Sequence, residues 1–317
     1  MDPKLTAAYI FAILFDVAMP IAFALYAHRR LGVSWRYFWY GALIFFLFQM
    51  ITRVPAVQLI QGLLAGPLSR SPLLVWVWTL TLALTAGLFE EGGRYLGYRH
   101  LIFRAKPSAI SHRPSAFHRP EPANMPEGTL SPLQQEAEGV GPEPRTTGPE
   151  PPGLRTQDSA LESWKKGVMY GLGHGGLESM LLVGGMVLLG FLNAVAITRM
   201  DPASVAALPP GQAAQVQQLQ VSFRTMAWWM PLLGTFERLC TVGIQVAFSI
   251  LVLQCFLRGS LRWLYLAVGA HFLVDFVTVV AAPRMGPVAA EGIVALFALA
   301  ALYLIFRLRP KPATSPA

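Results

Sequence analysis

The residues best suited to chemistry begin with His174 and Glu178, which lie inside the apolar stretch 164–192. This stretch is long enough to cross a bilayer, and ionisable side chains at that depth usually face a bundle interior or a wet cavity. A spacing of four residues places both side chains on one face of a helix. Close to the histidine are four glycines, which let other helices approach: Gly171, Gly173, Gly175 and Gly176. We therefore expect polar groups from neighbouring helices to point at His174.

A second group of ionisable residues, Glu90, Glu91 and Arg94, lies in the apolar stretch 72–98. Two adjacent carboxylates and an arginine are rare within a membrane-spanning helix. Arg94 follows Glu90 by four residues and Glu91 by three, so it can pair with either. Such a pair neutralises one carboxylate and leaves the other to take a proton from water. The spacing alone does not decide which glutamate is the base.

His271 and Asp275 form a third pair, four residues apart in the apolar stretch 261–280. An aspartate beside a histidine commonly orients the ring and stabilises the imidazolium. Glu90, His174 and His271 each lie about ten residues, or roughly 15 Å, from the end of their helix that carries basic residues. We therefore expect the three groups to meet in one plane inside the membrane, around a cavity that opens toward the cytoplasm.

Two weaker signals lie in the apolar stretch 226–257. Glu237 and Arg238 lie near its outer third, where they form either a self-contained pair or a part of the site. Gln245 lies closer to the depth of the histidines. The predicted supporting residues are Arg94, Glu178, Glu237 and Gln245.

The composition places these residues in a multi-pass membrane protein. Of the 317 residues, 54% are hydrophobic and 13% charged, and the mean hydropathy is +0.47, which excludes an ordinary soluble domain. The net charge of +8 fits basic cytoplasmic loops, and because no nucleic-acid-binding motif accompanies it, we expect no nucleic-acid partner. We predict an all-α fold, a polytopic membrane helix bundle of about seven transmembrane helices.

Apolar runs of spanning length define these predicted helices. They cover 6–27, 37–51, 72–98, 164–192, 226–257, 261–280 and 286–306. Lys and Arg gather in alternate loops, which predicts an N-terminus outside and a C-terminus in the cytoplasm. We expect the protein in the plasma membrane of a bacterium.

A polar segment divides the chain. Residues 105–162 are rich in Pro and Gly with almost no apolar periodicity, so we predict a disordered cytoplasmic insert. It separates helices 1–3 (1–104) from helices 4–7 (163–309), and a disordered tail covers 310–317. A second polar loop, 198–224, is Gln-rich in part and is expected to form a short surface helix outside.

The three motifs together resemble a known family. They are Glu90-Glu91 with Arg94, Tyr170-Gly-Leu-Gly-His174, and His271-Phe-Leu-Val-Asp275. This series resembles the CPBP intramembrane proteases, which include CAAX prenyl endopeptidases and bacteriocin-processing enzymes. The fuller strings FEEGGRY and GLGHGGLES resemble the YhfC-like branch of membrane peptidases. The likeness covers about residues 89–276 without the insert.

The resemblance implies roles for these residues. One glutamate of the first motif activates the attacking water, and the other forms a structural pair with Arg94. His174, His271 and Asp275 position the water and stabilise the oxyanion. The family pattern has one more residue before the arginine, so aligning on Arg94 makes Glu90 the structural partner and leaves Phe89 at the catalytic place. The choice between Glu90 and Glu91 therefore stays open.

We predict an intramembrane endopeptidase that hydrolyses a membrane-anchored peptide or protein, with Glu90, Glu91, His174, His271 and Asp275 as catalytic residues. No cofactor is required in this interpretation. The alternative is a zinc enzyme with His174, Glu178 and His271 as ligands; against it, Gln245 stands where YhfC-like sequences often have histidine. Two other classes stay open: a proton- or ion-coupled transporter, since buried Glu, His and Asp also form proton relays, and a non-catalytic membrane scaffold.

Overall fold

The computed structural model describes residues 2–103 and 152–311, with the backbone alone for 152–158. Within these ranges the regular structure is entirely helical, which confirms the predicted all-α class. Seven helical stretches of the described part are long and apolar enough to cross a membrane. The elements, with π-helical segments labelled η, are α1 (Pro3–Leu31), α2 (Arg36–Phe45), η1 (Phe46–Arg53), α3 (Val54–Arg70), α4 (Pro72–Gly97), η2 (Tyr98–Ile102), α5 (Pro152–Leu177), η4 (Glu178–Val183), α6 (Gly184–Arg199), α7 (Pro202–Ala206), α8 (Pro210–Thr225), α9 (Met230–Leu257), α10 (Arg262–Met285) and α11 (Pro287–Arg307).

The second span is longer than the sequence predicts. α2, η1 and α3 form one continuous helical stretch, Arg36–Arg70, so the prediction that this helix ends at residue 51 is wrong. Pro55 lies in the first turn of α3, where a missing N–H and a fixed φ are tolerated. The N–H of Val54 bonds to the carbonyl of Gln49 across the π-helical turn. Arg53 therefore belongs to a span and not to a loop.

The fourth span, Ser159–Arg199, combines α5, η4 and α6. α5 begins at Pro152, inside the predicted insert 105–162, and the rest of that insert up to residue 151 lies outside the described residues. Most of the predicted tail, 310–317, lies outside them as well. The Gln-rich part of the loop that follows forms α8, which buries no residue, as expected for a surface helix.

α9 is the central helix of the bundle. In its most apolar window 72% of the residues are buried, against 17% in α10, and it packs against α1, α5, α10 and α11. Every residue from Ile244 to Cys255 is buried. This position brings the side chains of Gln245 and Phe248 into the interior, where they contact residues of the other helices.

Glycines allow α5 to approach its neighbours closely, as the sequence predicts. A methyl group on Gly173 would overlap the carbonyl oxygen of Phe38 in α2, and one on Gly175 would lie 2.7 Å from Cβ of Gln245 in α9. Small residues at such crossings are typical of membrane helix packing. His174, between these two glycines, is consequently held against α2 and α9.

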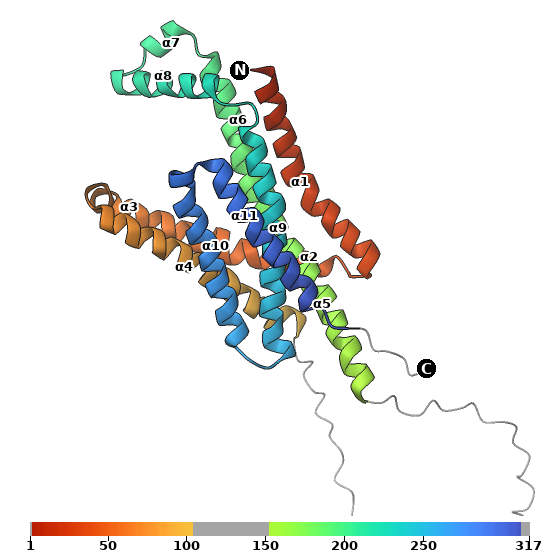
Figure 1. The fold of residues 1–317 in the computed structure, drawn as a ribbon. Coiled ribbons are helices and arrows are strands. Elements are labelled where there is room, and N and C mark those ends of the chain that lie inside the picture. Colours follow the sequence, from red (N-terminus) through yellow and green to blue (C-terminus); the bar gives the residue numbers. More distant parts are fainter. Residues whose placement is uncertain (1, 104–151, 312–317) are drawn as a thin grey trace, which may run out of the picture.

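α4 and α10 bring the remaining motifs together. They cross at Gly87, where a methyl group would lie 2.9 Å from the carbonyl oxygen of Val268. Toward its first residues α4 pairs with α3, and Figure 1 shows this helical pair extending away from the other helices. α3 buries no residue, and its exposed leucines, Leu59 and Leu63, suit contact with lipid. The first residues of α1 and the last residues of α11 lie toward opposite ends of the bundle (Figure 1).

Candidate active site

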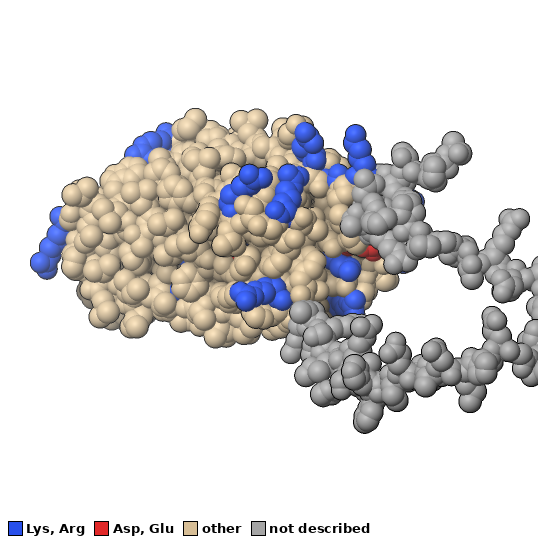
Figure 2. Space-filling view, turned by 90° about the horizontal axis from the view of Figure 1, so that it is seen from below, with Lys and Arg blue, Asp and Glu red and all other residues tan. Residues whose placement is uncertain are grey.

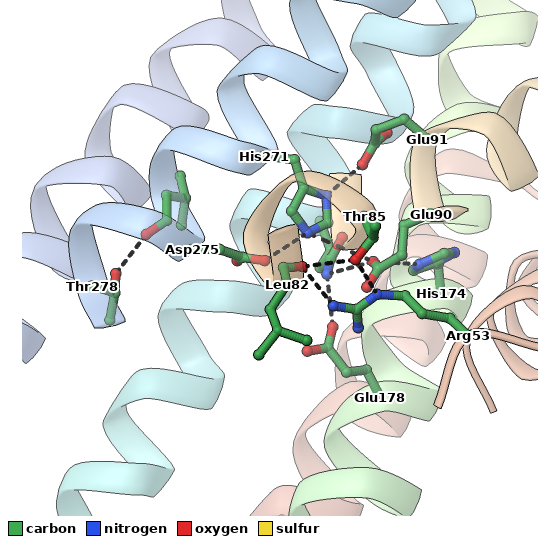
Figure 3. Close-up of polar contacts among 12 residues, drawn as sticks. Arg53, Leu82, Thr85, Glu90, Glu91, His174, Glu178, His271, Asp275 and Thr278 are labelled. Carbon is green, nitrogen blue, oxygen red and sulfur yellow. Dashed lines mark hydrogen bonds and ion pairs between the residues drawn. The ribbon is translucent and has the colours of Figure 1, made fainter. Parts of the chain in front are cut away.

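The carboxylate of Glu90 lies at the centre of the polar residues. Its Oε2 is 3.0 Å from Nε2 of His174 and 4.0 Å from Nε2 of His271. The same oxygen accepts a hydrogen bond of 3.3 Å from Nε2 of Gln245. Nη2 of Arg94 lies 3.6 Å away. Figure 3 shows Glu90, His174 and His271 converging from separate helices, so the side chains that the sequence places at one depth lie close together.

Glu91 points to different partners. Its Oε1 lies 2.7 Å from Nδ1 of His271 and accepts a short hydrogen bond from Nη1 of Arg94. Both Glu91 and Arg94 are fully buried. Nε2 of His271 then faces Glu90 and lies 3.6 Å from Oδ2 of Asp275. The carboxylate of Glu91 therefore fixes the His271 ring at Nδ1, and Nε2 of the same ring faces Glu90 and Asp275.

Aromatic rings hold both imidazoles in place. The ring of Phe248 stacks on His271 with a centroid distance of 4.9 Å and an interplanar angle of 16°. Phe45 meets His174 edge to face at 5.2 Å. Such contacts restrict ring rotation and exclude water from the apolar side of each ring.

Gln245 and Glu178 link this centre to a second ion pair. Nε2 of Gln245 donates to Oε2 of Glu178 at 2.7 Å, and its Oε1 accepts from Arg94. Oε1 of Glu178 accepts from Nη1 of Arg238 at 3.1 Å, and Nη2 of Arg238 bonds to Glu237. Glu237 and Arg238 are thus not self-contained: they continue the polar chain that begins at Glu90.

His174 and Glu178 do not contact each other's partners, although they are four residues apart. His174 reaches Glu90, whereas Glu178 bonds Gln245 and Arg238. The π-helical segment η4 begins at Glu178, and a π-turn changes the direction in which the following side chains point. Glu178 therefore lies beside the Glu90 centre and not within it.

A cavity of about 360 Å³ adjoins the site. Its wall includes Glu90, His271, Asp275, Gln245 and Glu178. Among the described residues that line it, His174, Glu91 and Arg94 do not appear. The site thus consists of side chains that line the cavity and of buried side chains that contact them on the side away from the cavity.

The cavity does not open where the sequence predicts. Side-chain exposure rises from 5% at Glu90 to 17% at Glu178, 32% at Glu237 and 35% at Asp275. From Glu90 its wall follows α4 back toward Pro72, away from the end of the bundle that carries the basic loops. The expectation of an opening at the basic end is therefore wrong, because the basic end of the site is closed by the buried side chains of α5 and α9.

Arg53 is the site residue that the sequence does not reveal. It lies in the cavity wall, where its Nη2 donates to the carbonyl of Leu82 at 2.7 Å and its Nε to Oγ1 of Thr85 at 3.4 Å. Figure 3 shows its guanidinium directed toward the Glu90 centre. The apolar character of the residues after Pro55 is the signal that could have extended the helix and kept Arg53 within it.

Fold and site together define a polytopic helical membrane protein with a carboxylate and imidazole centre inside its bundle. A family model described as YhfC intramembrane metalloprotease matches residues 15–111 and 155–298. The chain therefore belongs to the YhfC family. It is also 23% identical over 295 residues to the uncharacterized membrane protein YhfC of Bacillus subtilis (strain 168), covering 91% of this chain and 90% of the relative. No solved structure matches the chain. The YhfC part of the resemblance is confirmed, and the wider CPBP placement stays a prediction.

The family description names a metal, and the donor atoms of this chain do not fit one. Within the described ranges, no three His, Cys, Asp or Glu side chains gather in a way that could hold a metal ion. Of the predicted ligands, Glu178 is engaged by Arg238 and Gln245. Oε2 of Glu90, between both imidazoles, also faces N–H groups of Gln245 and Arg94, so a cation at this oxygen would lie against hydrogen-bond donors.

Proposed function

We propose that this protein is an intramembrane endopeptidase in which Glu90 activates water. One observation carries the proposal: the carboxylate of Glu90 faces a cavity on one side and is held by Nε2 of His174 on the other. A general base must lie within reach of the water it deprotonates and keep a fixed orientation. The family description supports the same class of reaction.

The proposed reaction is hydrolysis. Glu90 takes one proton from a water molecule in the cavity, and the water oxygen attacks the carbonyl carbon of the peptide bond. The proton then passes from Glu90 to the amide nitrogen as the C–N bond breaks, which gives a carboxylic acid and an amine. Gln245, which donates to Oε2 of Glu90, helps to fix the orientation of this carboxylate beside the cavity.

His271 and Asp275 provide the electrostatic stabilisation of the reaction in this proposal. Nε2 of His271 faces the cavity between Glu90 and Asp275. With Nδ1–H donated to Glu91, the imidazolium form of His271 has an N–H at this position, which donates to the oxygen that becomes negative during attack, where a fixed donor lowers the barrier most. Glu91 orients the ring through Nδ1, as carboxylates commonly orient functional histidines.

Glu91, Arg94 and His174 are positioning residues in this proposal. All three are fully buried. They hold the reacting groups without contact with the cavity. The geometry therefore favours Glu90 as the base and Glu91 as the partner of Arg94, a choice that the resemblance leaves open.

We propose a membrane-anchored peptide or protein as substrate and the plasma membrane of a bacterium as the location. Within a helix each peptide carbonyl is hydrogen-bonded to the N–H four residues on and is covered by the neighbouring turns, which hinders attack by water. The substrate must then be extended, not helical, at the bond that is cleaved.

The protein reconstituted into vesicles with membrane-anchored peptides tests the function. Cleavage in heavy-oxygen water should place the heavy oxygen in the new carboxyl terminus, because water supplies that atom. Proton flux across the vesicle membrane without peptide cleavage would contradict the peptidase proposal and indicate a proton-coupled transporter. Absence of both activities would favour a non-catalytic scaffold. A zinc-dependent form of the same reaction would show stoichiometric metal and loss of cleavage on chelation.

A further inference from the structure

The wall of the cavity extends toward one end of the bundle on three helices. From Glu90 its wall runs along α4 to Thr79, toward Pro72. It runs from Phe248 along α9 to Glu237, toward the first residue of that helix, and from His271 along α10 to Thr278, toward the last residue of that helix. We call Thr79, Glu237 and Thr278 the cavity mouth. Along all three helices the cavity wall extends toward the same end of the bundle.

The opposite end of the bundle is the basic one. The Lys and Arg side chains toward that end, among the described residues, are Arg29, Arg30, Arg36, Arg99, Lys165, Lys166, Arg258, Arg262, Arg307, Arg309 and Lys311. The end with the cavity mouth has Lys4, Arg70, Arg199, Arg224 and Arg284. Figure 2, seen from the basic end, shows Lys and Arg side chains spread over that face. An excess of Lys and Arg marks the cytoplasmic side of a membrane protein.

Aromatic rings mark the boundary between lipid and water at the basic end. The guanidinium of Arg258 lies 4.8 Å from the ring centroid of Trp263, and that of Arg309 lies 5.4 Å from Trp164. Tryptophan with neighbouring basic side chains is typical of the boundary between lipid and water. The basic end therefore lies at the cytoplasmic boundary, and the cavity mouth faces away from it.

A polar path leads from the mouth to the proposed base. Glu237, Arg238, Glu178 and Gln245 form a continuous series of hydrogen bonds and ion pairs that ends at Glu90. Apolar cavities stay dry, whereas a polar wall of this kind holds water. Hydrolysis inside a bilayer needs such a supply of water.

We propose that the site opens to the non-cytoplasmic side of the membrane. Its substrate is then an extended peptide segment that lies on that side, or in that half of the bilayer, next to a membrane anchor. This substrate class rests on the proposed peptidase function, whereas the direction of the opening does not.

Cysteine accessibility tests the opening without any need for activity. In a chain with Cys240 and Cys255 replaced by serine, Thr278→Cys and Thr79→Cys place a thiol at the mouth. Both threonine hydroxyls bond only to a carbonyl of their own helix, so neither change disturbs the polar path. Intact bacterial cells and inverted membrane vesicles are then treated with a membrane-impermeant thiol reagent.

Three control positions complete the experiment. Ala213→Cys in α8 reports the end with the mouth, Ser260→Cys between α9 and α10 reports the basic end, and Leu299→Cys reports the lipid-facing surface, since Leu299 is 63% exposed on an apolar helix. We expect both mouth positions and Ala213→Cys to be labelled in intact cells. Ser260→Cys should be labelled only in inverted vesicles, and Leu299→Cys in neither.

Labelling of the mouth positions from the Ser260→Cys side would overturn the proposal. Labelling from neither side would overturn it as well, because a water-filled mouth must admit the reagent. Labelling of Ser260→Cys in intact cells would show that the basic end lies on the non-cytoplasmic side. That result would contradict the proposed membrane orientation and, with it, the substrate class. All three results are independent of peptide cleavage, so failure of this inference is distinct from failure of the proposed function.

Discussion

Nε2 of His174 lies 3.0 Å from Oε2 of Glu90 in the protein interior, although 84 residues separate them in the sequence. His174 is fully buried and Glu90 lines the cavity. The imidazole thus reaches the carboxylate from behind and leaves its other face to the cavity. This relationship distinguishes Glu90 from Glu91, whose carboxylate is directed to Arg94 and His271.

The two histidines should respond differently to chemical rescue. His271→Ala should lower kcat by about 10²–10⁴-fold, the range for loss of a catalytic proton donor. Added imidazole should restore part of the rate, because the space left by His271 opens to the cavity. His174→Ala should lose activity without rescue, since its ring is fully buried behind Glu90. Equal rescue of both variants would show that His174 also faces the cavity.

Arg94 should matter for stability as well as for activity. Arg94→Met leaves the fully buried Glu91 without its guanidinium partner, and breaking one side of a buried ion pair costs about 3–5 kcal/mol. The variant should unfold at a markedly lower temperature in detergent. Arg99→Met, at an exposed position one turn beyond, is the matched control and should leave the melting temperature unchanged. A small effect at Arg94 would contradict the buried pair.

The close helix packing at Gly175, next to His174, should not tolerate an added methyl group. Gly175→Ala adds a methyl group 2.7 Å from Cβ of Gln245, and overpacking of this kind costs about 1–3 kcal/mol. Gly185→Ala meets nothing within 4 Å and serves as the control. Thermal unfolding of both variants should show a decrease for the first only. Equal stability would mean that α5 and α9 lie further apart.

Metal removal should leave the activity intact. The amide of Gln245 donates to both Glu90 and Glu178, at the place where a third nitrogen ligand would be needed. We expect the chelator-washed protein to cleave at the untreated rate and to contain metal well below one ion per chain. Gln245→His should raise zinc binding, since it adds an imidazole beside Glu90. Tightly held stoichiometric zinc in the wild-type protein would refute a purely glutamate-based mechanism.

Much of this arrangement could be predicted from the sequence because burial of charge in a membrane is costly. Glu90, His174 and His271 stand out in apolar stretches, and their equal depth predicts a common site. The glycines around His174 predict close helix packing, and α5 shows it. Helix bounds followed from the lengths of apolar runs to within a few residues, apart from the second span and the fourth, in which α5 begins at Pro152 and α6 ends at Arg199.

The remaining features depend on tertiary contacts that no local pattern records. The choice between Glu90 and Glu91 follows from which side of α4 faces α5 and which faces α10. Arg53 joins the cavity because α2 continues through a π-helical turn, and a proline nearby suggested the opposite. The direction of the cavity depends on how α4, α9 and α10 diverge, which periodicity does not encode.

The most direct measurement compares the cleavage rates of Glu90→Gln and Glu91→Gln in vesicles, with folding of each variant checked by its elution as a monodisperse species. Glutamine keeps the shape of the side chain and removes the base. Glu90→Gln should lower kcat by about 10²–10⁴-fold with little change in KM, whereas Glu91→Gln should lose stability and keep part of its activity. Wild-type kcat in Glu90→Gln would contradict Glu90 as the group that activates water.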